Sequence, residues 1–234
     1  MSRKSIAVCA LMVALTTGST RAGIVHEQPP SMNSGYAGDL EFVDDSGQNV
    51  WQQTADDFRL VNGAVIYQIS WYGFFGGRFV GTVAPPSGNE IIRARFYAAR
   101  PSDGLPGVAL YEETFVNPAR TATGNLVVDV RGHPEFLYTA DLSWPLALSA
   151  NATYWLEIVQ VDDVGSHFRW EGAGSTGSPL AYMNLFVSDW TLTTPLNDNM
   201  AFRLSSIPEP ATLVFAFLGI LSARREGHRP RRRR

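Results

Sequence analysis

Apolar and polar residues alternate along much of the chain with a period of two, which is the period of a β-strand. The pattern is clear in residues 64–72 (AVIYQISWY). We expect one face of this strand to carry its large apolar side chains, Val65, Tyr67, Ile69 and Trp71. That face should pack against a hydrophobic core.

Residues 90–98 (EIIRARFYA) form a second clear strand, and its two faces differ. The alternation places Ile92, Ala94 and Phe96 inward and Arg93, Arg95 and Tyr97 outward. Such a strand has one face on the core and the other toward solvent.

Further strands are predicted between segments rich in Gly, Pro, Asn and Asp, such as 102–107 (SDGLPG). They are residues 56–60, 108–116, 125–130, 135–142, 153–161, 167–171, 180–182 and 200–204. No segment between residues 23 and 206 shows the period of a helix. The pattern predicts an all-β fold: an antiparallel β-sandwich or jelly-roll-like single domain over 56–206, preceded by a partly ordered arm or extra edge strands over 23–55.

The first 22 residues have the three-part layout of a secretory signal peptide. A basic segment, residues 2–5, precedes the apolar run 6–15 (IAVCALMVAL) and a polar stretch that ends at Ala22. We therefore expect export, with cleavage after Ala22. The alternative is a buried N-terminal helix, which the basic start and the short apolar run disfavour.

The other end, residues 207–234, also has three parts. They are the motif Pro208-Glu209-Pro210, the largely apolar run 211–223, and an arginine-rich end that starts with Arg224 and Arg225. As a helix, the apolar run would span about 20 Å, which is less than the roughly 30 Å of a bilayer core. It therefore fits a transient membrane insertion better than a lasting one.

This end resembles the PEP-CTERM sorting signal of exported bacterial proteins, although Glu226-Gly227-His228 interrupts its arginines. The resemblance implies recognition by an exosortase, cleavage near the Pro-Glu-Pro motif, and a final place at the cell envelope, on the outer surface or in the extracellular matrix. Segments such as 56–73 also resemble the β-rich ectodomains that accompany such tails. The alternative is a Pro-rich linker followed by an ordinary tail-anchor helix.

Between these two ends the chain is acidic. Residues 23–207 carry 9 basic and 20 acidic side chains, a net charge of −11, whereas the whole chain has −3. This charge repels phosphate backbones, so we expect no binding of nucleic acid. The only cysteine, Cys9, lies in the predicted signal peptide, so the domain needs no disulfide.

The residue patterns give little indication of catalysis or of a cofactor. Residues 172–177 (GAGSTG) match G-x-G-x-x-G, but no helical pattern follows that could hold a nucleotide phosphate. His133 and His167 are the internal histidines that a hydrolase could use as catalytic residues. The residue spacing indicates no nucleophile beside either of them. The Asp-rich segment 39–47 is a weak candidate for calcium, and solvated loop charge is the simpler interpretation. We expect no enzyme activity.

Aromatic residues give the one functional indication inside the domain. Tyr72, Phe74 and Phe75 precede a Gly-rich segment, and we expect them in a loop. Exposed rings can stack on sugars, so these three are the candidate carbohydrate contacts. The alternative is that the rings fill the core between two sheets.

Three functions follow from these patterns. The first is an exported surface or matrix protein of structural or adhesive type, processed by an exosortase. The second is a polysaccharide-binding module with an exopolysaccharide partner. The third is a β-sandwich hydrolase.

Overall fold

The computed structural model describes residues 23–33, 35–37, 39–43, 49–76, 89–128, 132–161, 167–175, 180–184, 187–192 and 198–206. The predicted signal peptide and sorting segment lie outside them. All the described residues belong to one compact unit, Ala22–Ile207.

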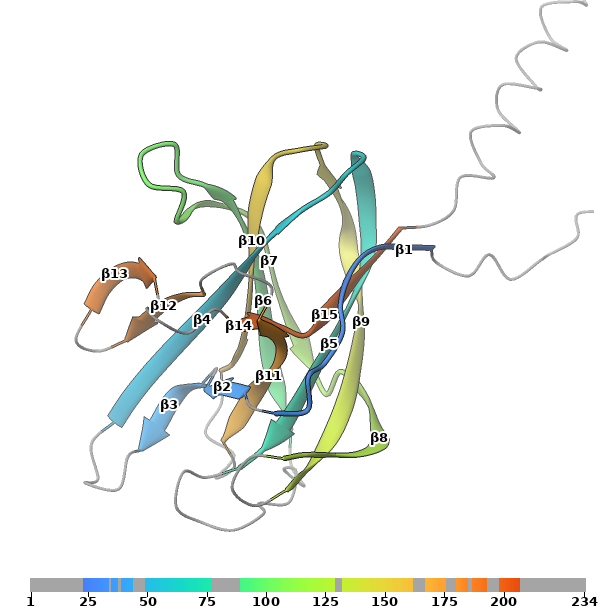
Figure 1. Ribbon diagram of the computed structural model, residues 1–234, viewed down its shortest axis with the longest axis vertical. Helices are drawn as coiled ribbons and strands as arrows, with labels where there is room; N and C mark the ends of the chain where they lie inside the picture. The colour runs from blue at the N-terminus through green and yellow to red at the C-terminus, as the bar shows by residue number, and fades with distance from the viewer. Residues whose placement is uncertain are drawn as a thin grey trace, which may run out of the picture. The chain divides into compact units, whose positions relative to one another are not determined.

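The described residues form two β-sheets packed together, which confirms the predicted all-β sandwich (Figure 1). Sheet 1 holds β1 (Gly23–Gln28), β2 (Gly35–Ala37), β5 (Ala64–Phe75), β8 (Ala119–Val127), β9 (His133–Leu148), β11 (Phe168–Ser175), β14 (Asp198–Met200) and β15 (Phe202–Ser206). Sheet 2 holds β3 (Asp39–Val43), β4 (Asn49–Arg59), β6 (Ile91–Ala99), β7 (Pro106–Val116), β10 (Thr153–Gln160), β12 (Ala181–Asn184) and β13 (Val187–Leu192). Neighbouring strands run antiparallel, apart from a short parallel contact between β3 and β10.

The main core lies between the sheets and draws on both. Trp71 of β5 stacks on Tyr138 of β9 with ring centroids 5.2 Å apart, and both side chains are fully buried. Sheet 2 contributes Phe96 and Leu156 to the same cluster. Apolar burial on this scale is the main favourable contribution to folding, and it offsets the absence of disulfides.

Strand β6 confirms the predicted faces. Ile92, Ala94 and Phe96 are fully buried in the main core. Tyr97 points to the other face as expected, but it is buried too, because its ring packs edge-on against Trp190 at 5.7 Å in a second, smaller cluster. The outer face of sheet 2 is therefore partly covered.

Strand β5 departs from the predicted alternation. Ile69 and Trp71 are buried as expected, but Val65 is 40% exposed and Ile66 is buried instead. The register with β15 shifts between Ile66 and Gln68, where two steps along β5 match one step along β15. Such a β-bulge inserts one extra residue and inverts the inward positions on one side of it.

The segment expected as an arm or edge strands is part of both sheets. β1 lies at the edge of sheet 1, beside β15. β4, however, begins at Asn49 and crosses the expected boundary at residue 56, and it lies between β12 and β10. Among the side chains that the structure describes before that boundary, the buried ones are Thr54 and Ala55, which are too small to produce a hydrophobic alternation in the sequence.

Candidate functional site

The three predicted carbohydrate contacts do not lie in a loop. Tyr72, Phe74 and Phe75 are the end of β5, and their exposed fractions are 6%, 0% and 1%. The placement in a loop was wrong because the strand runs on to Phe75 at the start of the Gly-rich segment. Rings this deeply buried offer no face to a sugar.

Each of these rings has a partner inside the protein. Phe75 packs edge-on against Phe168 in the main core, at 6.1 Å. Phe74 stacks on the His133 imidazole at 5.4 Å on the opposite face of the sheet. The Arg203 guanidinium lies over Tyr72, 5.3 Å from the ring centroid. Their role in this structure is packing.

The other candidates from the sequence are resolved only in part. His133 is 2% exposed, so its ring lies inside the molecule and away from the surface. Of the Asp-rich segment 39–47, residues 44–47 lie outside the described residues. Within the described part of the chain, no three His, Cys, Asp or Glu side chains are grouped so that they could hold a metal ion.

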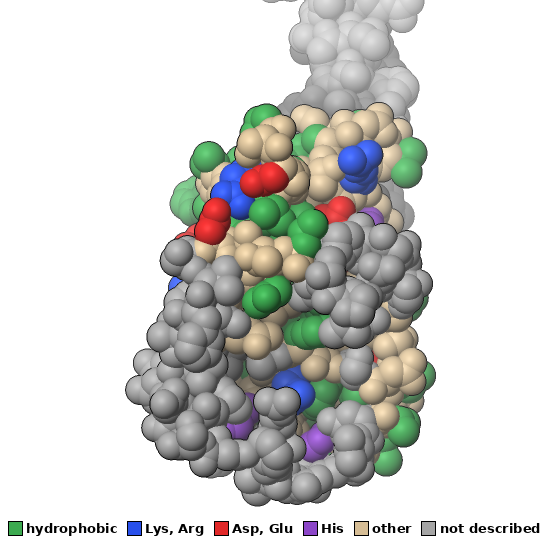
Figure 2. All heavy atoms as spheres, turned by 60° about the vertical axis from the view of Figure 1, so that its left-hand side comes forward, with side chains coloured by type: hydrophobic (Ala, Val, Ile, Leu, Met, Phe, Trp, Pro, Cys, Tyr) green, Lys and Arg blue, Asp and Glu red, His purple; other side chains and the backbone are tan. Residues whose placement is uncertain are grey.

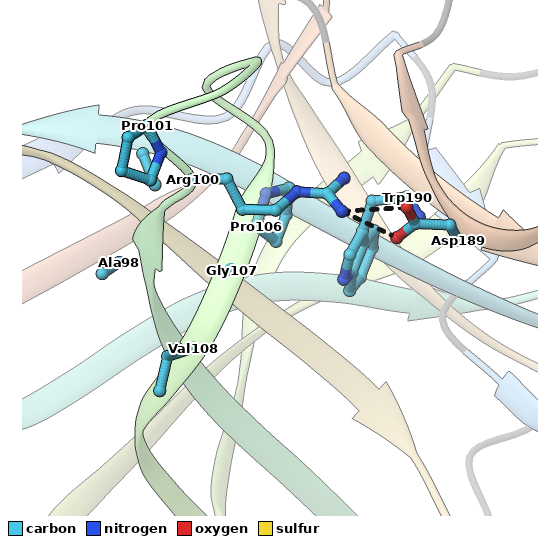
Figure 3. Close-up of a pocket in the computed structure, with 9 residues that line it drawn as sticks. Ala98, Arg100, Pro101, Pro106, Gly107, Val108, Asp189 and Trp190 are labelled. Atoms are coloured by element: carbon cyan, nitrogen blue, oxygen red, sulfur yellow. Dashed lines mark hydrogen bonds and ion pairs between the residues drawn. The ribbon is translucent and has the colours of Figure 1, made fainter.

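A shallow groove of about 600 Å³ lies where β6 and β7 meet β13 (Figure 3). The Arg100 guanidinium spans it to the Asp189 carboxylate, with N–O distances of 2.8 and 3.2 Å. Small residues and prolines line the rest, and Trp190 lies at its side. On the face brought forward in Figure 2, hydrophobic side chains lie beside a group of acidic and basic ones. Because the ion pair is exposed, it contributes little stability.

A more distinctive feature is Trp144, whose side chain is 75% exposed. The other tryptophans whose side chains the structure describes, Trp71, Trp155, Trp170 and Trp190, are 9% exposed or less. Trp144 lies where the register between β9 and β5 breaks: Leu146 pairs with Ile66, but Asp141 already pairs with Gln68. The intervening residues of β9 bulge out of the sheet and carry the indole with them.

The bulge is held by β7 of the other sheet. The Glu113 carboxylate accepts a hydrogen bond from the Ser143 backbone N–H at 3.0 Å and another from the Ser143 hydroxyl. It also accepts one from the Tyr111 hydroxyl, and the backbone N–H of Trp144 in turn donates to the Tyr111 oxygen at 3.4 Å. We call Tyr111, Glu113, Ser143 and Trp144 the Trp144 platform.

The two titratable side chains of the platform have the protonation states that these hydrogen bonds require. Partial burial acts to raise the pKa of Glu113, but the hydrogen bonds from Ser143 and Tyr111 outweigh it, and the pKa lies below its usual range. Burial and the Glu113 carboxylate raise the pKa of Tyr111 to about 12. Glu113 is therefore ionised and Tyr111 protonated at neutral pH, as acceptor and donor must be.

Covalent restraints make the bulge stiffer still. Pro145 locks its own backbone φ and restricts Trp144 to an extended conformation. Leu142 and Leu146, on either side, are 7% and 8% exposed and anchor the bulge in the core. The result is a large aromatic surface in solvent, on a backbone with little freedom left to lose.

One residue in the sequence indicates this bulge, although the strands predicted from the alternation did not take it into account. Pro145 lies inside an apolar segment, where a proline marks a bulge or an edge strand. The preceding Trp144 would then be displaced from the strand. Glu113, about thirty residues earlier in the chain, carried no comparable signal.

Fold and site together define a non-disulfide β-sandwich with a rigid, solvent-facing tryptophan. No protein-family model matches the chain, and no curated protein is significantly similar to it. The described residues contain no apolar helix of the length that a membrane span requires.

Proposed function

We propose that the chain is an exported surface protein of adhesive type whose sandwich binds polysaccharide at the Trp144 platform. The observation that carries this proposal is the 75% exposure of an indole on a bulge that donates three hydrogen bonds to β7, two to Glu113 and one to Tyr111. Covering a solvent-facing indole with the apolar face of a ligand is favourable, because it removes a large apolar area from contact with water.

Sugar rings fit such a surface. An indole face is apolar and can cover the C–H face of a pyranose, while hydroxyl groups around it bond to nearby polar side chains. Ser143, which is exposed and carries a hydroxyl, directly precedes Trp144 in the chain. Asp141, also exposed, lies three residues before Trp144. Because the bulge is already rigid, binding costs little conformational entropy.

The charge of the domain narrows the ligand class. Residues 23–207 have a net charge of −11, and the Glu113 carboxylate adds negative charge within the Trp144 platform itself. A polyanion would be repelled, so we favour a neutral or amino-bearing polysaccharide. The role is one of binding, without turnover.

The two ends of the chain support the same setting. The signal-peptide layout implies export, and the order of Pro-Glu-Pro, apolar run and arginines resembles a sorting tail that an exosortase would process. A protein released at the envelope of a polysaccharide-producing cell would meet such a ligand there.

The test compares the full chain with Trp144→Ala in affinity electrophoresis through gels that contain neutral polysaccharides, including that of the producing cell. We expect the variant to bind about tenfold more weakly, which corresponds to the loss of one aromatic stacking contact. Leu126→Ala removes another solvent-facing apolar side chain, 56% exposed, on a different strand, and this variant should bind like the parent.

Trp144→Phe keeps a ring and should retain part of the affinity. Equal binding by the parent and Trp144→Ala, or no retardation in any polysaccharide, would contradict the proposal. A structural role through protein contacts would then remain, and it would show as Trp144-dependent self-association in sedimentation.

A further inference from the structure

A second cluster of polar side chains lies on the opposite face of sheet 1 from the core. Trp170 and Phe136 point into the main core, so the residues next to them, Glu171 and Glu135, point to the outer face. Both carboxyls are nevertheless buried, with exposed fractions of 0% and 1%.

The two carboxyls meet each other there. They lie within hydrogen-bonding reach, yet Oε2 of Glu171 and Oε1 of Glu135 have no donor among the described groups. Two carboxylates are acceptors only, so a hydrogen bond between them requires one proton. Leaving both ionised would place two like charges side by side away from water.

The remaining oxygens of the pair bind the surroundings. Oε1 of Glu171 accepts the Met32 backbone N–H at 2.9 Å. Oε2 of Glu135 accepts an Asn125 side-chain N–H at 3.1 Å. The pair therefore joins β9, β11 and β8 to the segment that follows β1.

That segment, residues 29–33, crosses the outer face between β1 and β2 (Figure 1). Both the N–H and the hydroxyl of Ser31 donate to the Gly172 carbonyl, at 2.9 and 2.8 Å. The Met32 carbonyl accepts the Val128 N–H at 2.6 Å. Met32 itself has a φ of 58°, a left-handed conformation that non-glycine residues rarely adopt without compensating contacts.

We propose that Glu135 and Glu171 share one proton, that this proton holds segment 29–33 against sheet 1, and that an alkaline medium releases the segment. The proton leaves to solvent, both carboxylates become charged, and hydration of the pair then requires the cover over it to open. The inference does not depend on polysaccharide binding.

The electrostatics of this face agree with the proposal. Burial, then the nearby Glu135 carboxyl, raise the pKa of Glu171 to about 8, and the bond from Met32 opposes this only in part. The other titratable and charged groups on this face are Tyr72 of β5, His133 of β9, Arg169 of β11, and the ion pair of Glu27 (β1) with Arg203 (β15). The positive charge of Arg203 is already matched by Glu27 at 2.5 Å.

The direction of the pH dependence follows from the difference in the pKa of Glu171 between the closed and the opened segment. An opened segment exposes Glu171 to water, where its pKa returns toward the usual 4.5, so the closed form binds the proton more tightly. The opening equilibrium should therefore rise with pH from about 4.5 to 8, by up to about tenfold per pH unit, and level off above.

The test uses the purified full chain. We expect the Met32 amide resonance to titrate with a midpoint near pH 8, and hydrogen exchange of segment 29–33, corrected for the intrinsic rate, to rise from pH 6 to 8. Glu171→Gln keeps an acceptor for Met32 and supplies its own N–H to Glu135, so both pH dependences should disappear. Glu135→Gln should act in the same way, and Glu112→Gln, on sheet 2, should leave both unchanged.

Three results would overturn the proposal. One is a Met32 titration that persists in Glu171→Gln, or in Glu135→Gln if the first variant does not fold. Another is a segment that stays fully protected in the parent up to pH 9.5. The third is restoration of protection at pH 9 by calcium, which would make the pair a cation site.

Discussion

Glu157 shows at the scale of one residue how an outward-facing position can become buried. It alternates with the core residues Leu156 and Ile158 on β10, and so points away from the main core, yet it is 0% exposed. Its carboxylate accepts a hydrogen bond from the Tyr97 hydroxyl and lies 3.3 Å from the Arg93 guanidinium. Burial raises the pKa of Glu157, and these partners act against that rise.

We predict that Glu157→Ala lowers the free energy of unfolding by about 3 kcal/mol, because it leaves Arg93 and the Tyr97 hydroxyl buried without their acceptor. Urea denaturation would measure the change. Glu112→Ala is the matched control, since Glu112 pairs with Arg95 at 2.5 Å but is 49% exposed, and it should cost less than about 1 kcal/mol. Equal losses in the two variants would show that burial of Glu157 does not decide its contribution.

At the scale of the element, β5 organises sheet 1 because it pairs with β9 on one side and with β15 and then β11 on the other. At Gly73 the Phe168 ring crosses the strand closely. A Cβ added at Gly73 would lie 2.4 Å from Cε2 of Phe168 and 2.9 Å from the Arg169 carbonyl oxygen. The absence of a side chain is what allows β11 to pack there.

We predict that Gly73→Ala destabilises the protein by about 1–3 kcal/mol through this overlap. Thermal unfolding followed by near-ultraviolet circular dichroism would detect it, since Phe168 packs against Tyr138 and Phe75. Gly23→Ala, on the edge strand β1, serves as the control because its nearest neighbour would be 4.0 Å away. A Gly73→Ala protein as stable as that control would mean that β11 can shift at no cost.

At the scale of the whole molecule, β1 and β15 pair antiparallel, with Gly23 opposite Ser206. The first and last described residues, Gly23 and Ser206, therefore lie together at one edge of sheet 1 (Figure 1). Cleavage at both ends would leave only the acidic domain.

We predict that the exported protein has lost the residues before Gly23 and those beyond Pro210. Removal of seven arginines and one glutamate with the last residues would also shift its isoelectric point downward. Intact-mass spectrometry of material from outside the cell would measure both cleavages. A mature mass that still includes the arginine run would contradict processing by an exosortase.

The sequence by itself determined the fold class, because an alternation of apolar and polar residues can satisfy only a strand with one face on a core. It predicted the faces of β6 correctly from Ile92 to Tyr97. It also supplied the two predicted targeting segments, which depend on local composition and need no tertiary contact.

Only the tertiary structure decided where the alternation breaks and which polar groups meet. The bulges at Tyr67 and Trp144 arise from registers between strands, and Tyr72, Phe74 and Phe75 became packing residues because neighbouring strands and Gly35 cover β5. The contacts of Glu113 with Ser143, and of Glu135 with Glu171, join residues 30 and 36 positions apart in the chain. A single sequence encodes such pairs only through the fold, since no local period or spacing relates them.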